Sequence, residues 1–249
     1  MRLTGNTVLV TGGTSGIGRG LAEALHRLGN TVIVAGRRRA LLDEVAAANP
    51  GMHTVELDIA DPDSIARAAK RVLADHPDLN VLVNNAGIML ADDPAAPLDE
   101  DVVAAEVTTN LLGTLRTTSA FIEHLKTRPS ATILYNSSTL AFTPLASFAV
   151  YSATKAALHS YAMSQRFALR DTTVRVQEIT PPWVATGLVG TDDDPRAMPL
   201  DEFIAQTIEA LAGDSEEIVV EQARIYRDNA GPGEHAYVNE LNTYMATQL

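Results

Sequence analysis

Short apolar runs alternate along the chain with longer segments in which apolar positions recur at helical spacing. The runs are rich in β-branched residues, and they predict strands at residues 7–11, 31–35, 53–57, 81–83, 131–137, 174–180 and 217–220. The longer segments predict helices at residues 17–28, 61–75, 100–127, 151–169, 201–211 and 234–248. Because no proline-rich linker or internal repeat divides them, the pattern predicts one α/β domain, residues 1–249, with a doubly wound parallel sheet flanked by helices.

A cluster of glycines separates the first predicted strand from the first predicted helix. Gly12, Gly13, Gly16 and Gly18 lie in this turn, and the helix then runs to Leu28. A glycine-rich turn lets backbone amides approach a diphosphate, and the positive end of the following helix faces the anion. A glycine loop alone is often only a turn, but a strand before it and a helix after it favour dinucleotide binding.

Two other kinds of glycine loop are excluded by the residues at their working positions. A phosphate-binding Walker loop needs a lysine and a hydroxyl after its last glycine, where this chain has Arg19 and Gly20. A nucleophile elbow needs a glycine two residues after its serine, and Ile17 takes that position after Ser15. The pattern therefore disfavours phosphotransferases and esterases.

The end of the second predicted strand indicates which dinucleotide binds. An acidic residue there takes the ribose hydroxyls of NAD, whereas arginine accommodates the 2′-phosphate of NADP. Gly36 stands where the acid would be, and Arg37, Arg38 and Arg39 follow it. We therefore predict that NADP(H) is preferred over NAD(H), with Arg37 as the main phosphate ligand and Arg38 as the second. For Arg39 a solvated positive turn is the alternative.

A tyrosine and a lysine one helical turn apart are the strongest candidate for chemistry. Tyr151 and Lys155 share a face at the start of a predicted helix, so both can act on the same atom. A lysine charge nearby favours the phenolate, and we expect it to lower the pKa of Tyr151 from about 10. The alternative is a core tyrosine followed by a solvated lysine, and the pair alone is weak evidence.

Composition removes several classes of function. The formal net charge of −12 argues against nucleic acid or an anionic membrane surface as a partner. The chain has no cysteine, and no histidine or carboxylate cluster has metal-ligand spacing, so no metal site is predicted. His159 is interpreted as a packing or interface residue. With no visible secretory signal and no apolar run long enough for a membrane span, a cytoplasmic protein is expected.

These motifs together identify a family resemblance. The segment from Thr11 to Gly18, the run Asn84–Gly87, Asn110, Ser138 and the Tyr151/Lys155 pair resemble the short-chain dehydrogenase/reductase family over residues 5–190. Details such as Gly36-Arg-Arg and Pro181-Pro182 are similar to its DltE-type oxidoreductases. The resemblance implies a Rossmann fold with strand order 3-2-1-4-5-6-7. The family's usual Pro-Gly is replaced by Pro181-Pro182, and its common C-terminal ending is absent.

The resemblance also implies roles for individual residues. Tyr151 would be the general acid or base, Lys155 would lower its pKa and bind the nicotinamide ribose, Ser138 would bind the substrate oxygen, and Asn110 would hold a water. Cofactor contacts are implied for a larger set: Gly12, Thr14, Ser15, Gly16, Ile17, Gly18, Arg37, Arg38, Asp58, Ile59, Asn84, Ala86, Gly87, Tyr151, Lys155, Pro181, Val184 and Thr186. A homodimer or homotetramer is expected, by resemblance more than by sequence.

The substrate is the least determined feature. Apolar residues flank the catalytic segment, and they predict a small, neutral and largely hydrophobic carbonyl or alcohol substrate: Leu140, Phe142, Leu145, Phe148, Trp183, Leu188 and Met198. Arg196 is the only cation in these loops. Residues 188–213 are interpreted as a substrate lid region and 221–249 as a C-terminal tail that packs on its own domain or on a twin subunit.

Two other functions stay open. One is an NADP(H)-binding redox sensor or regulatory protein without turnover, which would have no need of a proton donor. The other is a sugar-nucleotide epimerase or dehydratase on a related longer fold. That second alternative is disfavoured by the glycine spacing and by the lack of a sizeable C-terminal substrate domain.

Overall fold

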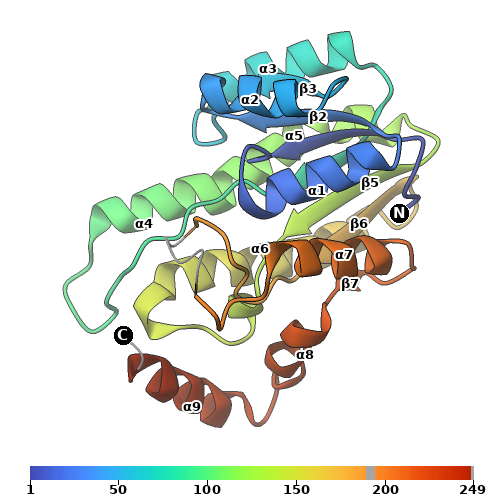
Figure 1. The fold of residues 1–249 in the computed structure, drawn as a ribbon. Coiled ribbons are helices and arrows are strands. Elements are labelled where there is room, and N and C mark those ends of the chain that lie inside the picture. The colour runs from blue at the N-terminus through green and yellow to red at the C-terminus, as the bar shows by residue number, and fades with distance from the viewer. Residues whose placement is uncertain (189–193, 248–249) are drawn as a thin grey trace.

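The computed structural model describes residues 1–188 and 194–247. Its centre is a seven-stranded parallel sheet in the order β3-β2-β1-β4-β5-β6-β7, as the family resemblance implies (Figure 1). The strands are β1 Thr7–Thr11, β2 Thr31–Gly36, β3 His53–Glu56, β4 Leu79–Asn84, β5 Ala131–Asn136, β6 Val174–Ile179 and β7 Glu217–Ile218. The order reverses between β1 and β4, so a crevice for a ligand is expected at the carboxyl ends of these two strands.

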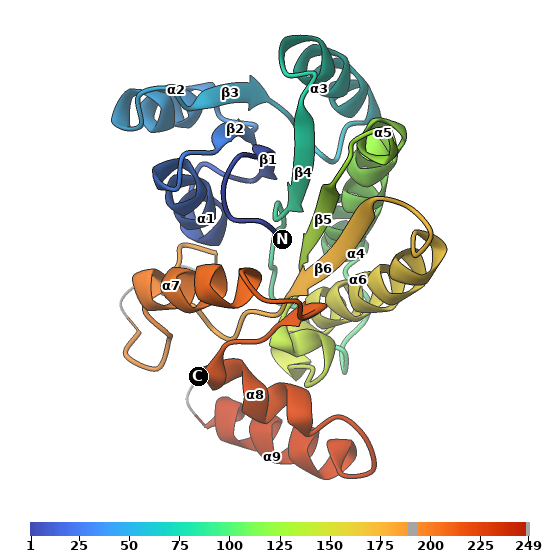
Figure 2. The same ribbon diagram turned by 90° about the vertical axis from the view of Figure 1, so that its right-hand side faces the viewer.

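Helices cover both faces of this sheet. They are α1 Gly16–Arg27, α2 Arg39–Ala48, α3 Pro62–Asp75, α4 Glu100–Glu106, α5 Thr114–Lys126, α6 Ala149–Ala168, α7 Leu200–Leu211, α8 Glu221–Asp228 and α9 Glu234–Ala246. Figure 2 shows α1 and α7 on one side of the strands and α3, α5 and α6 on the other. Successive residues of β1 point to opposite faces: Val8 and Val10 pack with α1 and α7, and Leu9 packs with α3 and α5.

Several predicted boundaries were wrong by one or two residues. β3, β5, β6 and β7 end earlier than predicted, while β2 gains Gly36 and β4 spans Leu79–Asn84. The apolar runs continue past the paired segments because the chain stays buried after it leaves the sheet. Ser137 is an example: it donates its N–H to the Ile179 carbonyl (2.9 Å) but already belongs to the loop after β5.

A larger correction concerns residues 100–127, which do not form the single helix that was predicted. A π-helix, η1 at Val107–Gly113, separates α4 from α5 and contains Asn110. Gly113 ends this widened turn against the loop after β3. A Cβ built there would lie 2.4 Å from the Ile59 carbonyl oxygen, so no larger residue fits without a backbone shift.

The predicted C-terminal tail forms two helices that pack on the domain's own loops (Figures 1 and 2). Thr143 Oγ1 donates to the Tyr226 carbonyl of α8 (3.2 Å). Asn242 of α9 donates to the Pro144 carbonyl (2.9 Å) and accepts the Ala146 N–H (2.5 Å). The helix predicted at 234–248 is α9, and Gln248 lies outside the described residues.

The predicted lid region begins next to an isolated parallel bridge between Val184 and Met198. Ala185 donates its N–H to the Met198 carbonyl (2.9 Å), and Met198 donates to the Trp183 carbonyl (2.8 Å). Residues 189–193 of this region lie outside the described residues, and α7 forms its second half. In the described part of the chain, no helix has the length and apolar character that a membrane crossing requires.

The close approach at Gly113 gives a stability prediction. We expect Gly113→Ala to lower the free energy of unfolding by about 1–3 kcal/mol, because the added methyl group overpacks against backbone. Urea denaturation measures the change. Gly233→Ala is the matched control, since a Cβ at Gly233 meets nothing within 4 Å and should change stability by less than about 0.5 kcal/mol. Equal stability of Gly113→Ala and wild type would contradict the packing argument.

Candidate active site

The loop after β1 is shaped for close backbone approach. Gly12 and Gly16 have φ angles of +64° and +52°, which favour glycine over residues with a side chain. A Cβ at Gly12 would lie 2.8 Å from the Ala86 Cα, and one at Gly18 would lie 2.3 Å from Asn85 Nδ2. The loop therefore packs directly on the segment after β4, and the positive N-terminus of α1 is set at the crevice.

The side chain of Asn85, which the sequence did not single out, holds three strand ends together; we call this set of hydrogen bonds the Asn85 lock. Its Nδ2 donates to the carbonyls of Thr11 (3.1 Å) and Gly12 (3.3 Å), and its Oδ1 accepts from Asn136 Nδ2 (2.8 Å). It therefore ties the ends of β1, β4 and β5 together. Its position after a strand was a signal, but nothing in the sequence distinguished it from Asn84.

Asn84, a predicted cofactor contact, is buried at the end of β4, and its Nδ2 donates to Thr118 Oγ1 on α5 (2.9 Å). Its Oδ1 has no hydrogen-bond partner among the described residues. Ala86 and Gly87 do lie at the crevice, because a Cβ on Gly87 would be 3.2 Å from Asn110 Oδ1 and 3.9 Å from Lys155 Nζ.

The end of β2 leaves two arginines exposed. Arg37 and Arg38 make no ion pair among the described residues, whereas Arg39 pairs with Asp43 (3.0 Å) as part of α2. A Cβ at Gly36 would lie 2.9 Å from Thr14 Cγ2, so an acidic side chain there would collide with the glycine loop.

The loop after β3 places two further predicted contacts. Asp58 is half-buried, and its Oδ1 accepts the Ala60 N–H (2.9 Å). Ile59 is buried where η1 ends.

Tyr151 and Lys155 lie on α6, as predicted, and both are almost fully buried. Lys155 donates from Nζ to the Asn136 carbonyl at the end of β5 (2.8 Å), and the same nitrogen is 5.4 Å from the centre of the Tyr151 ring. Ser138, two residues after Asn136, is buried and forms a hydrogen bond with Tyr151. Its Oγ also accepts the Leu140 N–H (3.1 Å).

Asn110 positions the segment after β4 beside this pair. Its side chain donates to the Ile88 carbonyl and accepts the Ile88 N–H, each at 2.8 Å. It also donates to Thr154 Oγ1 (3.3 Å), whose hydroxyl donates to the Tyr151 carbonyl. The π-helix widens the turn that carries Asn110, a local geometry that is frequent at functional sites.

Burial controls the protonation of both catalytic candidates. Burial raises the pKa of Tyr151 above its ordinary value of 10, and the hydrogen bond from Ser138 offsets only part of this effect. Burial also lowers the pKa of Lys155 to about 8, against the opposing charges of Glu178 and Glu106. The expectation that lysine would lower the pKa of Tyr151 was therefore wrong for this structure, because helical spacing indicates proximity but not the extent of desolvation.

Glu106 is a site residue with no signal in the sequence pattern. It is fully buried at the end of α4, its Oε1 accepts the Leu90 N–H (2.7 Å), and its Oε2 has no partner among the described residues. Burial raises the pKa of its carboxyl group. Its charge acts on both Tyr151 and Lys155.

The segment after β6 closes the crevice from the other side. Pro181 and Val184 are buried, and the Pro181 carbonyl accepts the Thr139 N–H (2.9 Å). Thr186 covers the glycine loop, since its Cγ2 would lie 3.3 Å from a Cβ at Gly16. Of these predicted cofactor residues, Thr186 therefore lies directly against the loop after β1.

The residues predicted to line a substrate pocket divide into groups. Half-buried positions flank Ser138 and the crevice, at Leu140, Phe142, Leu145, Phe148 and Trp183, and Leu188 is exposed. Met198 is buried and packs in the core with α7. Arg196 lies over the Trp183 ring at 4.9 Å and is held by both oxygens of Asp194.

Comparison with known proteins shows the family of this chain. The model for short chain dehydrogenases matches residues 6–197, which include every catalytic candidate. The chain belongs to the short chain dehydrogenase family. This dehydrogenase is 39% identical over 249 residues to the uncharacterized oxidoreductase DltE of Bacillus subtilis, covering 98% of this chain and 99% of that protein. The resemblance inferred from the motifs is confirmed.

Two further relatives carry names that mention a cofactor. An NADP-dependent 3-hydroxy acid dehydrogenase of Schizosaccharomyces pombe is 28% identical, over 95% of this chain and 98% of its own length. A short chain dehydrogenase from Burkholderia cenocepacia, solved in complex with NADP, is 30% identical with a TM-score of 0.86, covering 97% of this chain and 99% of that one.

The Asn85 lock gives a prediction about nucleotide binding. We expect Asn85→Ala to weaken NADPH binding about tenfold, because the glycine loop loses the hydrogen bonds that hold it against β4. Fluorescence titration with NADPH measures the Kd. Asn80→Ala is the matched control: Asn80 donates to Asn6 and the Ser130 carbonyl at the opposite end of β4, so its loss should lower stability and leave the Kd unchanged. Equal Kd values for Asn85→Ala and wild type would refute the lock.

Proposed function

We propose that this dehydrogenase interconverts a carbonyl and a secondary alcohol by hydride transfer with NADP(H), using Tyr151 as general acid and base. The observation that carries the proposal is the meeting of Ser138, Tyr151 and Lys155 at the carboxyl end of the sheet, beside the glycine loop. NADP(H) supplies the hydride when bound. The protein's own residues orient the reacting groups and move the proton.

In the reduction direction, Tyr151 would act as the general acid. With its pKa raised above 10, the phenol is protonated at neutral pH and can donate to a carbonyl oxygen. Ser138 supplies a second hydroxyl beside the phenol, suited to hold the same oxygen. Lys155, bonded to the Asn136 carbonyl, keeps two further ammonium protons for the ribose of the nucleotide.

The preference for NADP(H) is supported by residues at the end of β2. Arg37 and Arg38 are exposed cations, and Gly36 leaves no room for the acid that would bind the ribose hydroxyls of NAD. The names of the relatives from Schizosaccharomyces pombe and Burkholderia cenocepacia agree with this preference.

A neutral, largely apolar substrate is supported by the loops around Tyr151. Phe142, Leu145 and Trp183 are half-buried there. The one cation in these loops, Arg196, already forms a two-oxygen ion pair with Asp194. On this basis we propose a ketone, aldehyde or secondary alcohol, and not a 3-hydroxy acid.

A homo-oligomer is supported by one exposed helix face. On α6, Met163 and Phe167 are one turn apart on the same face and expose 46% and 68% of their surface, whereas Tyr161, 36% exposed, lies on another side of the helix. Large apolar side chains gathered on one helix favour burial against a second copy.

A redox sensor without turnover stays the alternative to an enzyme, and the prediction for Tyr151→Phe distinguishes these two functions.

We expect Tyr151→Phe to lower kcat by about 10²- to 10⁴-fold and to leave the Kd for NADPH within about twofold, since only proton transfer is lost. Loss of NADPH absorbance against ketones, aldehydes and diketones measures turnover. Tyr161→Phe, at an exposed position of the same helix, is the control and should behave as wild type. Turnover by Tyr151→Phe within tenfold of wild type would contradict the proposed role.

We expect Arg37→Ala to raise the Kd for NADPH by about 10- to 100-fold and to leave that for NADH unchanged, because a charge-assisted hydrogen bond to the 2′-phosphate is lost. Binding titrations with both nucleotides measure this. Arg39→Ala is the control, since Arg39 already pairs with Asp43. Wild-type turnover with NADH as efficient as with NADPH would overturn the assignment.

A further inference from the structure

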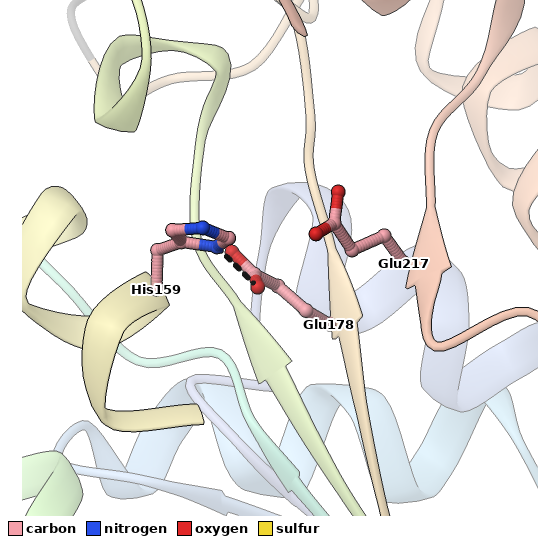
Figure 3. Close-up of side chains that lie close together, drawn as sticks. All are labelled: His159, Glu178 and Glu217. Atoms are coloured by element: carbon pink, nitrogen blue, oxygen red, sulfur yellow. Dashed lines mark hydrogen bonds and ion pairs between the residues drawn. The ribbon is translucent and has the colours of Figure 1, made fainter. Parts of the chain in front are cut away.

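A second polar cluster lies between α6 and the strands β6 and β7. Figure 3 shows His159 of α6, Glu178 of β6 and Glu217 of β7, whose ligand-type atoms all lie within 4.8 Å of one another. His159 donates from Nδ1 to Glu178 Oε2 (2.8 Å). The site described above uses none of the three side chains for contact with substrate or cofactor.

The arrangement is not that of a metal centre. Both oxygens of Glu217 are taken by Arg227, which donates from Nε (2.7 Å) and Nη2 (3.2 Å). A metal ion would have to displace this guanidinium or lie beside its charge. The Arg227 ion pair and the nearby Arg166 lower the pKa of Glu217 although burial raises it, so Glu217 is a neutralised partner of Arg227.

Glu178 is the unusual member of the cluster. It is fully buried, and its Oε1 has no hydrogen-bond partner among the residues that the structure describes. A buried carboxylate with half its acceptor capacity unused is costly unless another positive charge lies close. His159 satisfies only one of its two oxygens.

Lys155 lies on the same helix as His159, the hydrogen-bond partner of this carboxylate. Lys155 and His159 are one turn apart on α6, so they share a face of that helix. His159 bonds the side chain of Glu178, and Lys155 bonds the carbonyl of Asn136. In the ladder of β5 and β6, Glu178 pairs with Tyr135, which is the neighbour of Asn136. The two bonds from α6 thus reach adjacent strands at adjacent positions.

We propose that Glu178 is a positioning residue for Lys155: its buried carboxylate, oriented by His159, supplies the negative charge that keeps the Lys155 ammonium in place and protonated beneath the nucleotide. The inference rests on the proposed function, which gives Lys155 its role. It assigns Glu217 and Arg227 to a separate pair, which borders the cluster and leaves the charge of Glu178 free to act on the lysine.

The charges around Lys155 support this assignment. Burial lowers its pKa to about 8, and Glu178 is the largest of the charges that oppose the effect, ahead of Glu106 of α4. The other groups that face the lysine are Tyr151 of α6 and the Asn136 carbonyl of β5. Below pH 8 the ammonium is charged, and its charge is lost as the pH rises through 8. Removing Glu178 moves that loss to lower pH.

The test is a titration of Lys155 in the free protein. The chain has only three lysines, Lys70, Lys126 and Lys155, so selective ¹³Cε-lysine labelling gives three NMR signals, and Lys155→Met identifies the third. We expect Glu178→Gln to move the midpoint of the Lys155 titration down by about one pH unit or more. An unchanged midpoint would overturn the proposal.

Two more variants keep the test decisive. Glu217→Gln is the matched control, because its carboxylate belongs to Arg227, and it should leave the Lys155 midpoint close to that of wild type. A shift as large as that of Glu178→Gln would show that the charge of the whole cluster matters and would overturn the role of Glu178. If Glu178→Gln does not fold, Glu178→Met removes the same charge with an apolar side chain of similar length, and the same downward shift is expected.

Turnover measured across pH separates this inference from the proposed function. If both hold, the alkaline limb of kcat with NADPH moves down with the NMR midpoint in Glu178→Gln, whereas a merely structural role would lower kcat equally at all pH values. The NMR titration needs no substrate or cofactor. A shifted midpoint without turnover on any carbonyl would therefore refute the proposed function and leave the electrostatic role of Glu178 standing.

Discussion

The burial of the Lys155 ammonium is the constraint around which the candidate site is arranged. A buried charge is costly, by several kcal/mol per ion, unless neighbouring groups compensate it. Here the compensating groups come from two strands and one helix: the Asn136 carbonyl of β5, Glu178 of β6 and Glu106 of α4. Each of these groups is held in turn by the sheet ladder, by His159 or by the Leu90 amide. The groups that oppose the effect of burial on the Lys155 charge thus come from α4 and β6 as well as from the catalytic helix's own neighbour β5.

A second constraint is steric and acts at the crevice itself. Gly12 and Gly18 let the loop after β1 touch Ala86 and Asn85, and Gly113 lets η1 touch the loop after β3. Asn85 then fixes the contact with hydrogen bonds to two carbonyls and to Asn136. Since Asn136 also receives the bond from Lys155, the lock on the nucleotide loop and the support of the catalytic lysine share one residue at the end of β5.

Sequence pattern predicted the features that depend on local composition. The strands, the glycine loop and the pairing of Tyr151 with Lys155 follow from apolar runs and helical spacing, and the strands begin and end within two residues of the predicted boundaries. It could not predict the π-helix, because a shift from one hydrogen-bond partner to the next leaves the apolar pattern of residues 100–127 unchanged. Nor could it predict the buried carboxylates, since Glu178 lies in a strand that also contains Arg175 and Gln177, so nothing in the pattern marks it as buried. The raised pKa of Tyr151 depends on desolvation, which is a property of the packed fold.

The family match ends at residue 197, yet the helices beyond it help to shape the substrate side of the site. The Phe142 ring, in the loop after Ser138, meets His159 edge-on at 4.6 Å and the Arg227 guanidinium at 4.4 Å. One neighbour belongs to the catalytic helix α6 and the other to α8, so this loop is held between them. Thr143 and Ala146 extend the same attachment to α8 and α9. The family model thus covers the motifs of the candidate site, whereas the position of the loop after Ser138 also depends on the C-terminal helices α8 and α9.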